Sequence, residues 1–133
     1  MQTAARRGAE VHLVASEKDD QWVVALAQAS YYEDLLEAGV LVHLYREGFL
    51  HAKHLSVDDA VALIGTSNLD IRSFALNAEV MLMIYDHGVT ARLAAEQERY
   101  FANSRLLSLA EWRRRPFGGK VAENLARLLS PLL

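Results

Sequence analysis

Apolar residues recur along the chain with two different periods. Alternation at every second residue predicts β-strands, and a spacing of three or four residues predicts amphipathic helices. The pattern predicts strands at residues 11–15, 40–45, 51–57, 61–65 and 77–85, and helices at residues 2–7, 21–38, 89–103 and 120–129. Strands mixed with flanking helices indicate the α/β class, with a mixed β-sheet flanked by helices. Residues 77–85 are apolar on both sides at their centre, so we expect this strand to be central in its sheet.

Capping residues mark where several of these helices begin and end. Gly8 and Gly39 each follow a helical segment and are expected to be C-cap glycines. Ser108 and Glu111 form a capping box, which predicts a further short helix. Because the helix closed by Gly8 starts at the first residue, we expect the chain to begin inside an element, as a piece of a longer protein would.

Length and composition limit the class of protein. With 133 residues, 52% hydrophobic residues and a formal net charge of −3, the chain is expected to fold as one domain with a buried core. The absence of cysteine excludes a disulfide framework, thiolate-ligated zinc and a cysteine nucleophile. No apolar run approaches the roughly 18 residues that a membrane-spanning helix needs.

Charge divides the chain into a body and a tail. Residues 111–133 contain five basic and two acidic residues, whereas residues 1–110 carry a net charge of −6. An acidic body argues against a general nucleic-acid-binding protein, so we expect no nucleic acid as a partner. In the tail, Val121, Leu125 and Leu128 fall at helical spacing and predict a basic amphipathic helix. Such a helix can lie in a membrane interface or pack on its own domain, and both alternatives stay open.

His51 and Lys53 are the first candidates for chemistry. Residues two apart in a strand project on the same face, so the imidazole and the ammonium group are expected to lie side by side. Together they can receive a phosphate: the lysine neutralises its oxygens, and the imidazole attacks phosphorus or protonates a leaving oxygen. After the next strand, Gly65 permits close backbone approach, and Thr66 and Asn68 can bring neutral donors to the same anion.

These residues follow the pattern H-x-K-x4-D-x6-G-[ST]-x-N, and the chain thereby resembles the phospholipase D superfamily. The flanking segments 48–53, 68–73, 77–79, 112–116 and 129–133 look like the C-terminal half of bacterial cardiolipin synthases. The resemblance implies one lobe of a phospholipase D-like fold, with residues 1–110 as the catalytic lobe and residues 111–133 as the helical tail. The defined positions of the motif are occupied by His51, Lys53, Asp58, Gly65, Thr66 and Asn68.

The resemblance also implies a role for each site residue. His51 would be the nucleophile or the acid/base partner, and Lys53, Thr66 and Asn68 would bind the phosphate oxygens. Asp58 belongs to the catalytic motif, although a structural role in its turn is the favoured interpretation. Glu79 matches a carboxylate that orients the motif histidine, with pairing to Arg72 as the alternative. Neither a metal nor a cofactor is implied.

Members of this type use two such motifs, whereas this chain has one, so it is expected to hold half of an active site. The implied reaction joins two phosphatidylglycerol molecules into cardiolipin and glycerol through a phosphohistidine intermediate. The implied partners are an anionic phospholipid, the membrane surface, and the other motif-bearing half or a second copy of this chain. The implied location of the parent protein is the bacterial inner membrane. Two alternatives are a single-motif homodimeric phosphodiesterase or nuclease and a non-catalytic membrane-docking module.

Overall fold

The computed structural model describes residues 1–18, 22–68, 73, 76–116, 119, 123 and 125–126, with the backbone alone for residues 22 and 23. The predicted helix at residues 120–129 therefore lies largely outside the described residues. The elements, in chain order, are α1 (Gln2–Arg6), β1 (His12–Ser16), α2 (Trp22–Ala29), α3 (Tyr32–Glu37), β2 (Leu41–Tyr45), β3 (His54–Val57), β4 (Val61–Gly65), β5 (Met81–Ile84), α5 (His87–Ala102), β6 (Ser104–Leu106) and α6 (Leu109–Arg113).

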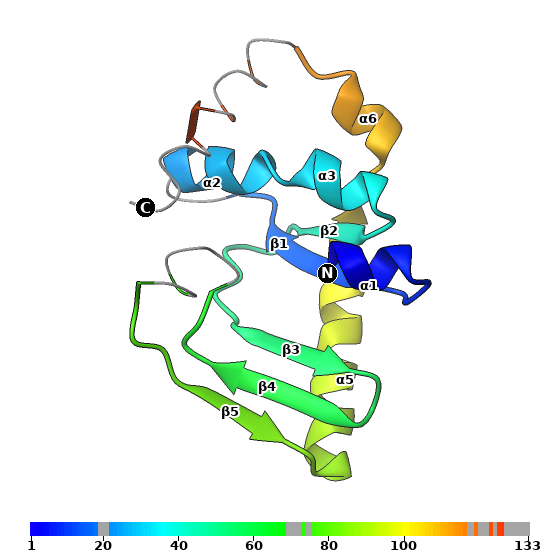
Figure 1. Cartoon of the computed structure of the whole chain (residues 1–133), viewed down its shortest axis with the longest axis vertical. Helices are drawn as coiled ribbons and strands as arrows, with labels where there is room; N and C mark the ends of the chain where they lie inside the picture. Colours follow the sequence, from blue (N-terminus) through cyan, green and yellow to red (C-terminus); the bar gives the residue numbers. More distant parts are fainter. Residues whose placement is uncertain are drawn as a thin grey trace.

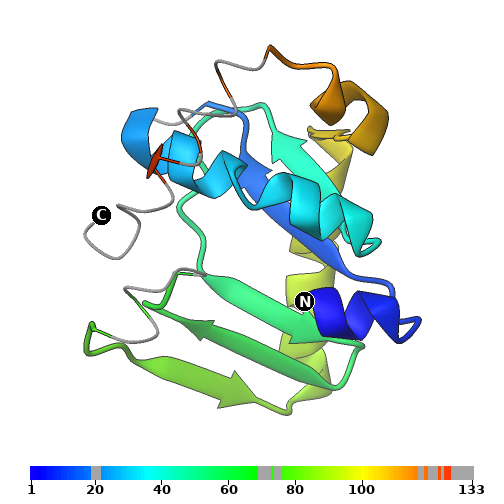
Figure 2. The ribbon, with the colours of Figure 1, turned by 45° about the horizontal axis from the view of Figure 1, so that its top comes forward.

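The strands form two small sheets, which confirms the α/β class (Figure 1). The first sheet has the order β1-β2-β6, with β1 parallel and β6 antiparallel to β2. The second sheet has the order β3-β4-β5 and is antiparallel throughout. Helices α2, α3 and α6 lie on one side of the first sheet, and α5 runs behind both sheets (Figures 1 and 2).

Local hydrogen bonds explain where the first helices end. Gly39 has a φ of +89°, and the Val40 amide donates to the Leu35 carbonyl oxygen at 3.0 Å, so α3 closes as the glycine predicts. The single helix predicted at residues 21–38 is instead two helices. The Ser30 hydroxyl donates to the Ala27 carbonyl oxygen at 2.6 Å, and this side-chain bond competes with the helical ladder between α2 and α3.

The core lies between the first sheet and helices α3 and α6. Val40, Val42 and Leu44 are buried at its centre. Trp112 packs on Tyr32 with ring centroids 5.3 Å apart, so α6 contributes to the same core. Helix α6 spans the boundary predicted between residues 110 and 111, and the first residues of the tail are therefore packed on the lobe. The Ser108 half of the predicted capping box is confirmed, since the Ser108 hydroxyl accepts a hydrogen bond from the Glu111 amide, whereas the Glu111 carboxylate accepts from Arg105.

Strand β5 corrects one prediction from the sequence. It was expected to be central, but it lies at the edge of its sheet and pairs with β4 alone among the described strands. Its apolar side chains stay accessible, with Leu82 63% exposed and Met83 51% exposed. An apolar strand is therefore not sufficient evidence of a central position, because apolar residues on both faces are compatible with an edge strand as well.

Helix α5 connects the two sheets. Asp86 caps it by accepting a hydrogen bond from the Val89 amide at 2.9 Å. In its middle, Gln97 accepts from the Ser56 hydroxyl at 2.7 Å and contacts the His54 ring at 3.2 Å, so α5 covers one face of the second sheet. Within the described part of the chain, no helix is long and apolar enough to cross a bilayer.

Candidate active site

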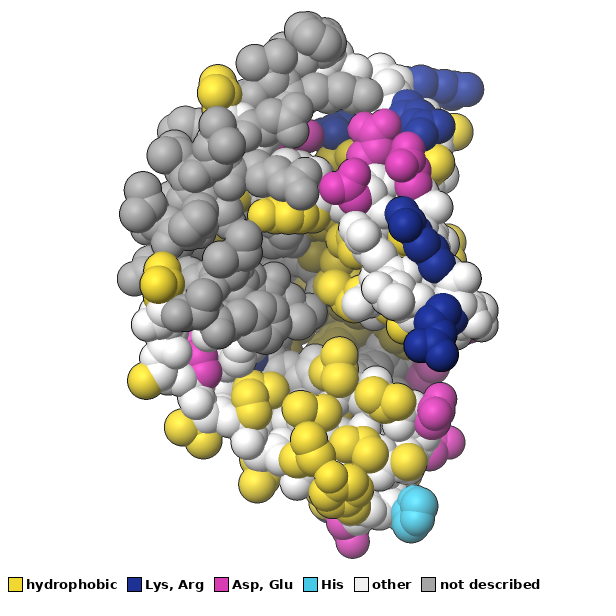
Figure 3. All heavy atoms as spheres, viewed as in Figure 1, with side chains coloured by type: hydrophobic (Ala, Val, Ile, Leu, Met, Phe, Trp, Pro, Cys, Tyr) yellow, Lys and Arg dark blue, Asp and Glu magenta, His cyan; other side chains and the backbone are white. Residues whose placement is uncertain are grey.

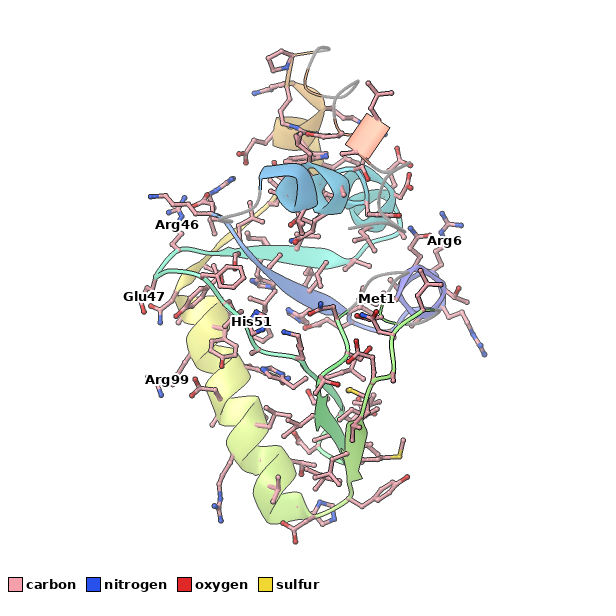
Figure 4. The ribbon with its side chains drawn as sticks, turned by 90° about the vertical axis from the view of Figure 1, so that its left-hand side faces the viewer. Met1, Arg6, Arg46, Glu47, His51 and Arg99 are labelled. Carbon is pink, nitrogen blue, oxygen red and sulfur yellow. The ribbon has the colours of Figure 1, made fainter. Side chains whose placement is uncertain are left out.

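The strand predicted at residues 51–57 begins only at His54, and His51 lies on the segment that enters it (Figure 4). Lys53 lies on the same segment and contacts His51. The Lys53 ammonium lies 2.7 Å from Nε2 of His51. An ammonium group has only donors, so Nε2 accepts this bond and a neutral imidazole carries its proton on Nδ1. The lone pair of Nε2 therefore points at the Lys53 ammonium, so an imidazole with a free lone pair and a cation lie side by side.

Two contacts far apart in sequence fix this segment between the sheets. The Leu50 amide donates to the Ser16 hydroxyl at 2.9 Å, at the end of β1 in the first sheet. The Lys53 carbonyl oxygen accepts from the Gly65 amide at 3.1 Å, at the end of β4 in the second sheet. His51 thus lies where the two sheets approach each other. The Ser16 contact was missed in the sequence, because no spacing rule links a strand end to a residue 34 positions later.

Gly65 occupies a position with no room for a side chain. A Cβ atom there would lie 2.1 Å from the Val80 carbonyl oxygen and 2.9 Å from Cα of Met81. This close approach brings the end of β4 against the start of β5. The sequence predicts that Gly65 permits close backbone approach at an anion site, and in the structure the backbone that Gly65 approaches is that of Val80 and Met81 at the start of β5.

Thr66 and Glu79 lie beside Gly65, at the same end of the second sheet. The Thr66 hydroxyl donates to a carboxylate oxygen of Glu79 at 2.5 Å, and it accepts from the Val80 amide at 3.0 Å. Hydrogen bonds, first from Thr66 and then from Asn77, together with the charge of Lys53, lower the pKa of Glu79 against an opposing effect of desolvation. Glu79 therefore stays ionised near the Lys53 ammonium, although its bonds go to Thr66 and Asn77 rather than to His51.

Asn68 lies exposed just beyond Thr66. Its backbone amide donates to the buried hydroxyl of Ser73 at 3.2 Å, which orders the turn that carries it. The Ser67 hydroxyl donates to the Asn68 carbonyl oxygen, as expected of a turn residue. Arg72, the alternative partner for Glu79, lies outside the described residues.

Asp58 is separated from the other candidate residues. It sits in the turn between β3 and β4 with a φ of +47°, and its side chain is exposed. Because a strand rises about 3.3 Å per residue, Asp58 lies roughly 16 Å along the strand from Lys53. The structure therefore groups His51, Lys53, Thr66 and Glu79, and places Asp58 where it shapes the hairpin.

The other histidines lie away from this group. His54 packs on Tyr100 of α5, and burial lowers its pKa. His12 and His43 are hydrogen bonded to each other at 2.9 Å on the first sheet. No cluster of three or more metal-ligating side chains occurs among the residues that the structure describes.

Sequence comparison identifies relatives over almost the whole chain. A family model described as "Cardiolipin synthase, PLD-like domain" matches residues 1–104. Cardiolipin synthase A of Serratia proteamaculans (strain 568) is 44% identical over 131 residues, and that of Pectobacterium carotovorum subsp. carotovorum (strain PC1) is 42% identical. Each alignment covers 98% of this chain and 27% of the relative, so the chain spans about a quarter of these proteins.

Solved structures share the fold at low sequence identity. Phosphatidylserine synthase from Haemophilus influenzae Rd KW20 superposes with a TM-score of 0.69 and 21% identity, over 98% of this chain and 37% of that one. Nuc from Salmonella typhimurium, a phospholipase D family member, gives a TM-score of 0.64 and 16% identity, over 80% of this chain and 70% of that one. With the motif residues in place and the family model matching residues 1–104, the chain belongs to the phospholipase D-like domain family of cardiolipin synthases.

Proposed function

We propose that this chain is the C-terminal catalytic half of a cardiolipin synthase-like phosphatidyltransferase. The observation that carries the proposal is the contact between Nε2 of His51 and the Lys53 ammonium, which joins a nucleophile to a phosphate anchor. The relatives that match 98% of the chain are cardiolipin synthases A, and this supports phosphatidylglycerol as the substrate. The membrane of a bacterial cell is the expected place of action for the parent protein.

In the first step, Nε2 of His51 attacks the phosphorus of a bound phosphatidylglycerol. Lys53 exchanges its bond to His51 for one to a phosphate oxygen, and the Thr66 hydroxyl exchanges its bond to Glu79 in the same way. Asn68 donates to the same anion. The new nitrogen–phosphorus bond forms while the bond from phosphorus to the glycerol oxygen breaks. Glycerol leaves with a proton supplied by a second histidine, which the partner half contributes.

In the second step, a hydroxyl of another phosphatidylglycerol gives its proton to that second histidine and attacks the phosphorus. The nitrogen–phosphorus bond breaks, His51 is restored, and cardiolipin is released. Glu79 serves as a positioning residue: its carboxylate lies within the field of Lys53 and accepts from Nδ1 of His51 once phosphate has drawn Lys53 away. Asp58 holds the hairpin turn that sets the register of β3 and β4.

A chimeric enzyme tests this proposal. In Escherichia coli cardiolipin synthase A, the segment that aligns with this chain is replaced by the chain itself, and cardiolipin formation from phosphatidylglycerol is followed by thin-layer chromatography. The chimera is expected to be active, and His51→Ala is expected to abolish transfer. His87→Ala, an exposed histidine at the start of α5, is the matched control and should retain activity. Transfer at the unsubstituted rate by the His51→Ala chimera would contradict the proposal.

A second candidate function is a homodimeric phosphodiesterase. The observation that favours it is the match to Nuc, because this chain covers 70% of that structure's length. Hydrolysis of bis(p-nitrophenyl) phosphate by the isolated chain, with loss in Lys53→Met, would support this candidate. The acidic body makes a nucleic acid a poor substrate, since polyanions require a basic surface. A non-catalytic membrane-docking module is the remaining alternative, and it predicts vesicle binding that is unchanged in His51→Ala.

A further inference from the structure

Two consecutive residues at the end of β1 hold both ends of the loop that leads to the motif histidine. The Ser16 hydroxyl accepts a hydrogen bond from the Leu50 amide at 2.9 Å, and the Glu17 carboxylate accepts one from Nε of Arg46 at 3.1 Å. We call the segment between these two contacts the 46–50 loop. Both of its ends are therefore fastened to the same place on the first sheet.

Backbone hydrogen bonds hold Glu17 and Arg46 in place. The Glu17 amide donates to the Tyr45 carbonyl oxygen at 2.8 Å, and the Arg46 amide donates to the Asn103 carbonyl oxygen at 3.1 Å. These bonds extend the pairing of β2 with its neighbours β1 and β6 by one residue. Figure 4 shows Arg46 beside the first sheet and His51 between the two sheets, so the loop starts on a supported strand end and leads to the candidate site.

The Glu17 carboxylate also separates two cations. Arg105 of β6 donates from Nε to Oε1 of Glu17 at 3.0 Å, while Arg46 bonds Oε2. The hydrogen bond from Arg105 and the charges of both arginines lower the pKa of Glu17 against desolvation, so this carboxyl is ionised at neutral pH. Without its charge the two guanidinium groups would repel each other. Arg46, with 55% of its side chain exposed against 29% for Arg105, is the one that would move away.

Ion pairs by themselves are ordinary on this surface. Figure 3 shows acidic and basic side chains side by side along one margin of the molecule, and Arg113 of α6 bonds Glu33 and Glu37 of α3. Exposed pairs of this kind contribute little to stability. The Glu17 pair differs because one of its partners opens the loop that carries the motif histidine, so its loss changes the candidate site as well as the surface.

His51 and Lys53 depend on different anchors. His51 directly follows the 46–50 loop, and its ring lies against that of Phe49 with centroids 5.5 Å apart, so its position follows that of the loop. The Lys53 carbonyl oxygen instead accepts from an amide at the end of β4, which ties the lysine to the second sheet. A displaced loop would therefore move the imidazole while the ammonium group stays where it is.

We infer that Glu17 is a positioning residue for His51, which it holds in place through its bond to Arg46. The bond fixes the 46–50 loop, and through it the distance from the imidazole to a phosphate bound by Lys53. The inference rests on the proposed function for the reaction itself. A residue that places the attacking group without touching the bound anion affects kcat rather than KM. Misplacement by about 1 Å can cost about 10²-fold in rate.

Steady-state kinetics of the chimeric synthase tests the inference in the reaction. Glu17→Gln should lower kcat about tenfold and change KM for phosphatidylglycerol by less than about twofold. Arg46→Gln should act similarly, and the double variant should be no slower than the slower single variant, because both substitutions break one bond. Glu111→Gln is the matched control, since it removes the other carboxylate that bonds Arg105 and leaves the 46–50 loop untouched. Its kcat should stay within about twofold of the unsubstituted value.

NMR spectroscopy of the complete 133-residue chain tests the same placement without the reaction. The ring current of Phe49 affects the Hδ2 and Hε1 signals of His51, so a displaced loop should shift them. The spectra are recorded well above the ordinary histidine pKa of about 6.5, which keeps the imidazole neutral throughout. Glu17→Gln should move the His51 signals, and Glu111→Gln should leave them in place. The exposed His87 serves as the internal reference.

Three results would overturn the inference. The first is a kcat that is unchanged in Glu17→Gln, or that falls equally in Glu111→Gln. The second is a loss that appears in KM instead of kcat, and the third is a Glu17→Gln chain whose His51 signals coincide with the original ones. Circular dichroism confirms that the variants fold. A chimera that is inactive without any substitution, while the His51 signals move in Glu17→Gln alone, would contradict the proposed function and support the placement of His51 by Glu17.

Discussion

Replacing Gly65 by alanine should destabilise the lobe and at the same time disturb the candidate active site. The added Cβ would lie 2.1 Å from the Val80 carbonyl oxygen, 2.6 Å from Sδ of Met81 and 2.9 Å from Cα of Met81. The methionine sulfur can swing aside, but the other two atoms belong to the backbone of β5. The strand itself must therefore move, and with it the Val80 amide that bonds Thr66.

Overpacking costs typically 1–3 kcal/mol, and contact with backbone places this substitution near the upper end, at about 3 kcal/mol. For a domain of this size, each kcal/mol lowers the melting temperature by about 4 °C, so Gly65→Ala should melt about 12 °C below the unsubstituted chain. Differential scanning calorimetry measures this shift. Gly119→Ala is the control, because nothing lies within 4 Å of its added Cβ and little change is expected. A Gly65→Ala melting temperature within about 2 °C of the original would refute the close approach of β4 and β5.

Three further predictions concern single side chains. Thr66→Val removes the hydrogen bond from Thr66, which is the largest cause of the lowered pKa of Glu79. NMR titration of the Glu79 carboxyl should therefore show its pKa rising toward the ordinary value of 4.5. An unchanged pKa would contradict the assigned hydrogen bond. Because the folded-state pKa of Glu79 is depressed, its carboxylate favours the folded state above about pH 4.5. The difference in urea stability between Thr66→Val and the unsubstituted chain should therefore shrink as the pH falls through the folded-state pKa. Ser108→Ala removes the N-cap of α6 and should cost about 1 kcal/mol in urea unfolding, whereas Ser108→Asp should preserve stability. Trp112→Ala should lower the free energy of unfolding by about 3–5 kcal/mol, because the ring is buried against Tyr32 and lies under the Arg115 guanidinium. A loss below about 1 kcal/mol would show that α6 is not part of the core.

Local signals in the sequence predicted most of the elements. Strand β4 was predicted at residues 61–65 and lies at Val61–Gly65, because apolar residues on both sides of a turn define a hairpin. The glycine C-caps and the Ser108 N-cap could also be predicted, since each depends on residues a few positions apart. The break between α2 and α3 was not predicted, because the pattern of apolar residues continues through Ser30 while its hydroxyl bonds the backbone.

The contacts between residues far apart in the sequence were harder to predict. The fixed spacing of the motif predicted that His51 and Lys53 project side by side from one strand. Both residues precede β3, which begins at His54, but the structure shows their side chains in contact. The same spacing says nothing of Ser16, which anchors Leu50 from the other sheet. Nor does the apolar pattern separate a central strand from an edge strand, and β5 was misplaced because apolar residues on both faces are compatible with either position.

The segment that carries His51 is also a mechanical link. Residues 46–53 run from β2 in one sheet to β3 in the other, while α5 supports both sheets from behind. The Leu50 amide, held by Ser16, ties this link to the first sheet, and the Gly65 amide ties it to the second. Any twist of one sheet against the other about α5 therefore changes the distance from His51 to Thr66. The exchange rates of these two amide hydrogens would report how rigidly the lobe holds His51.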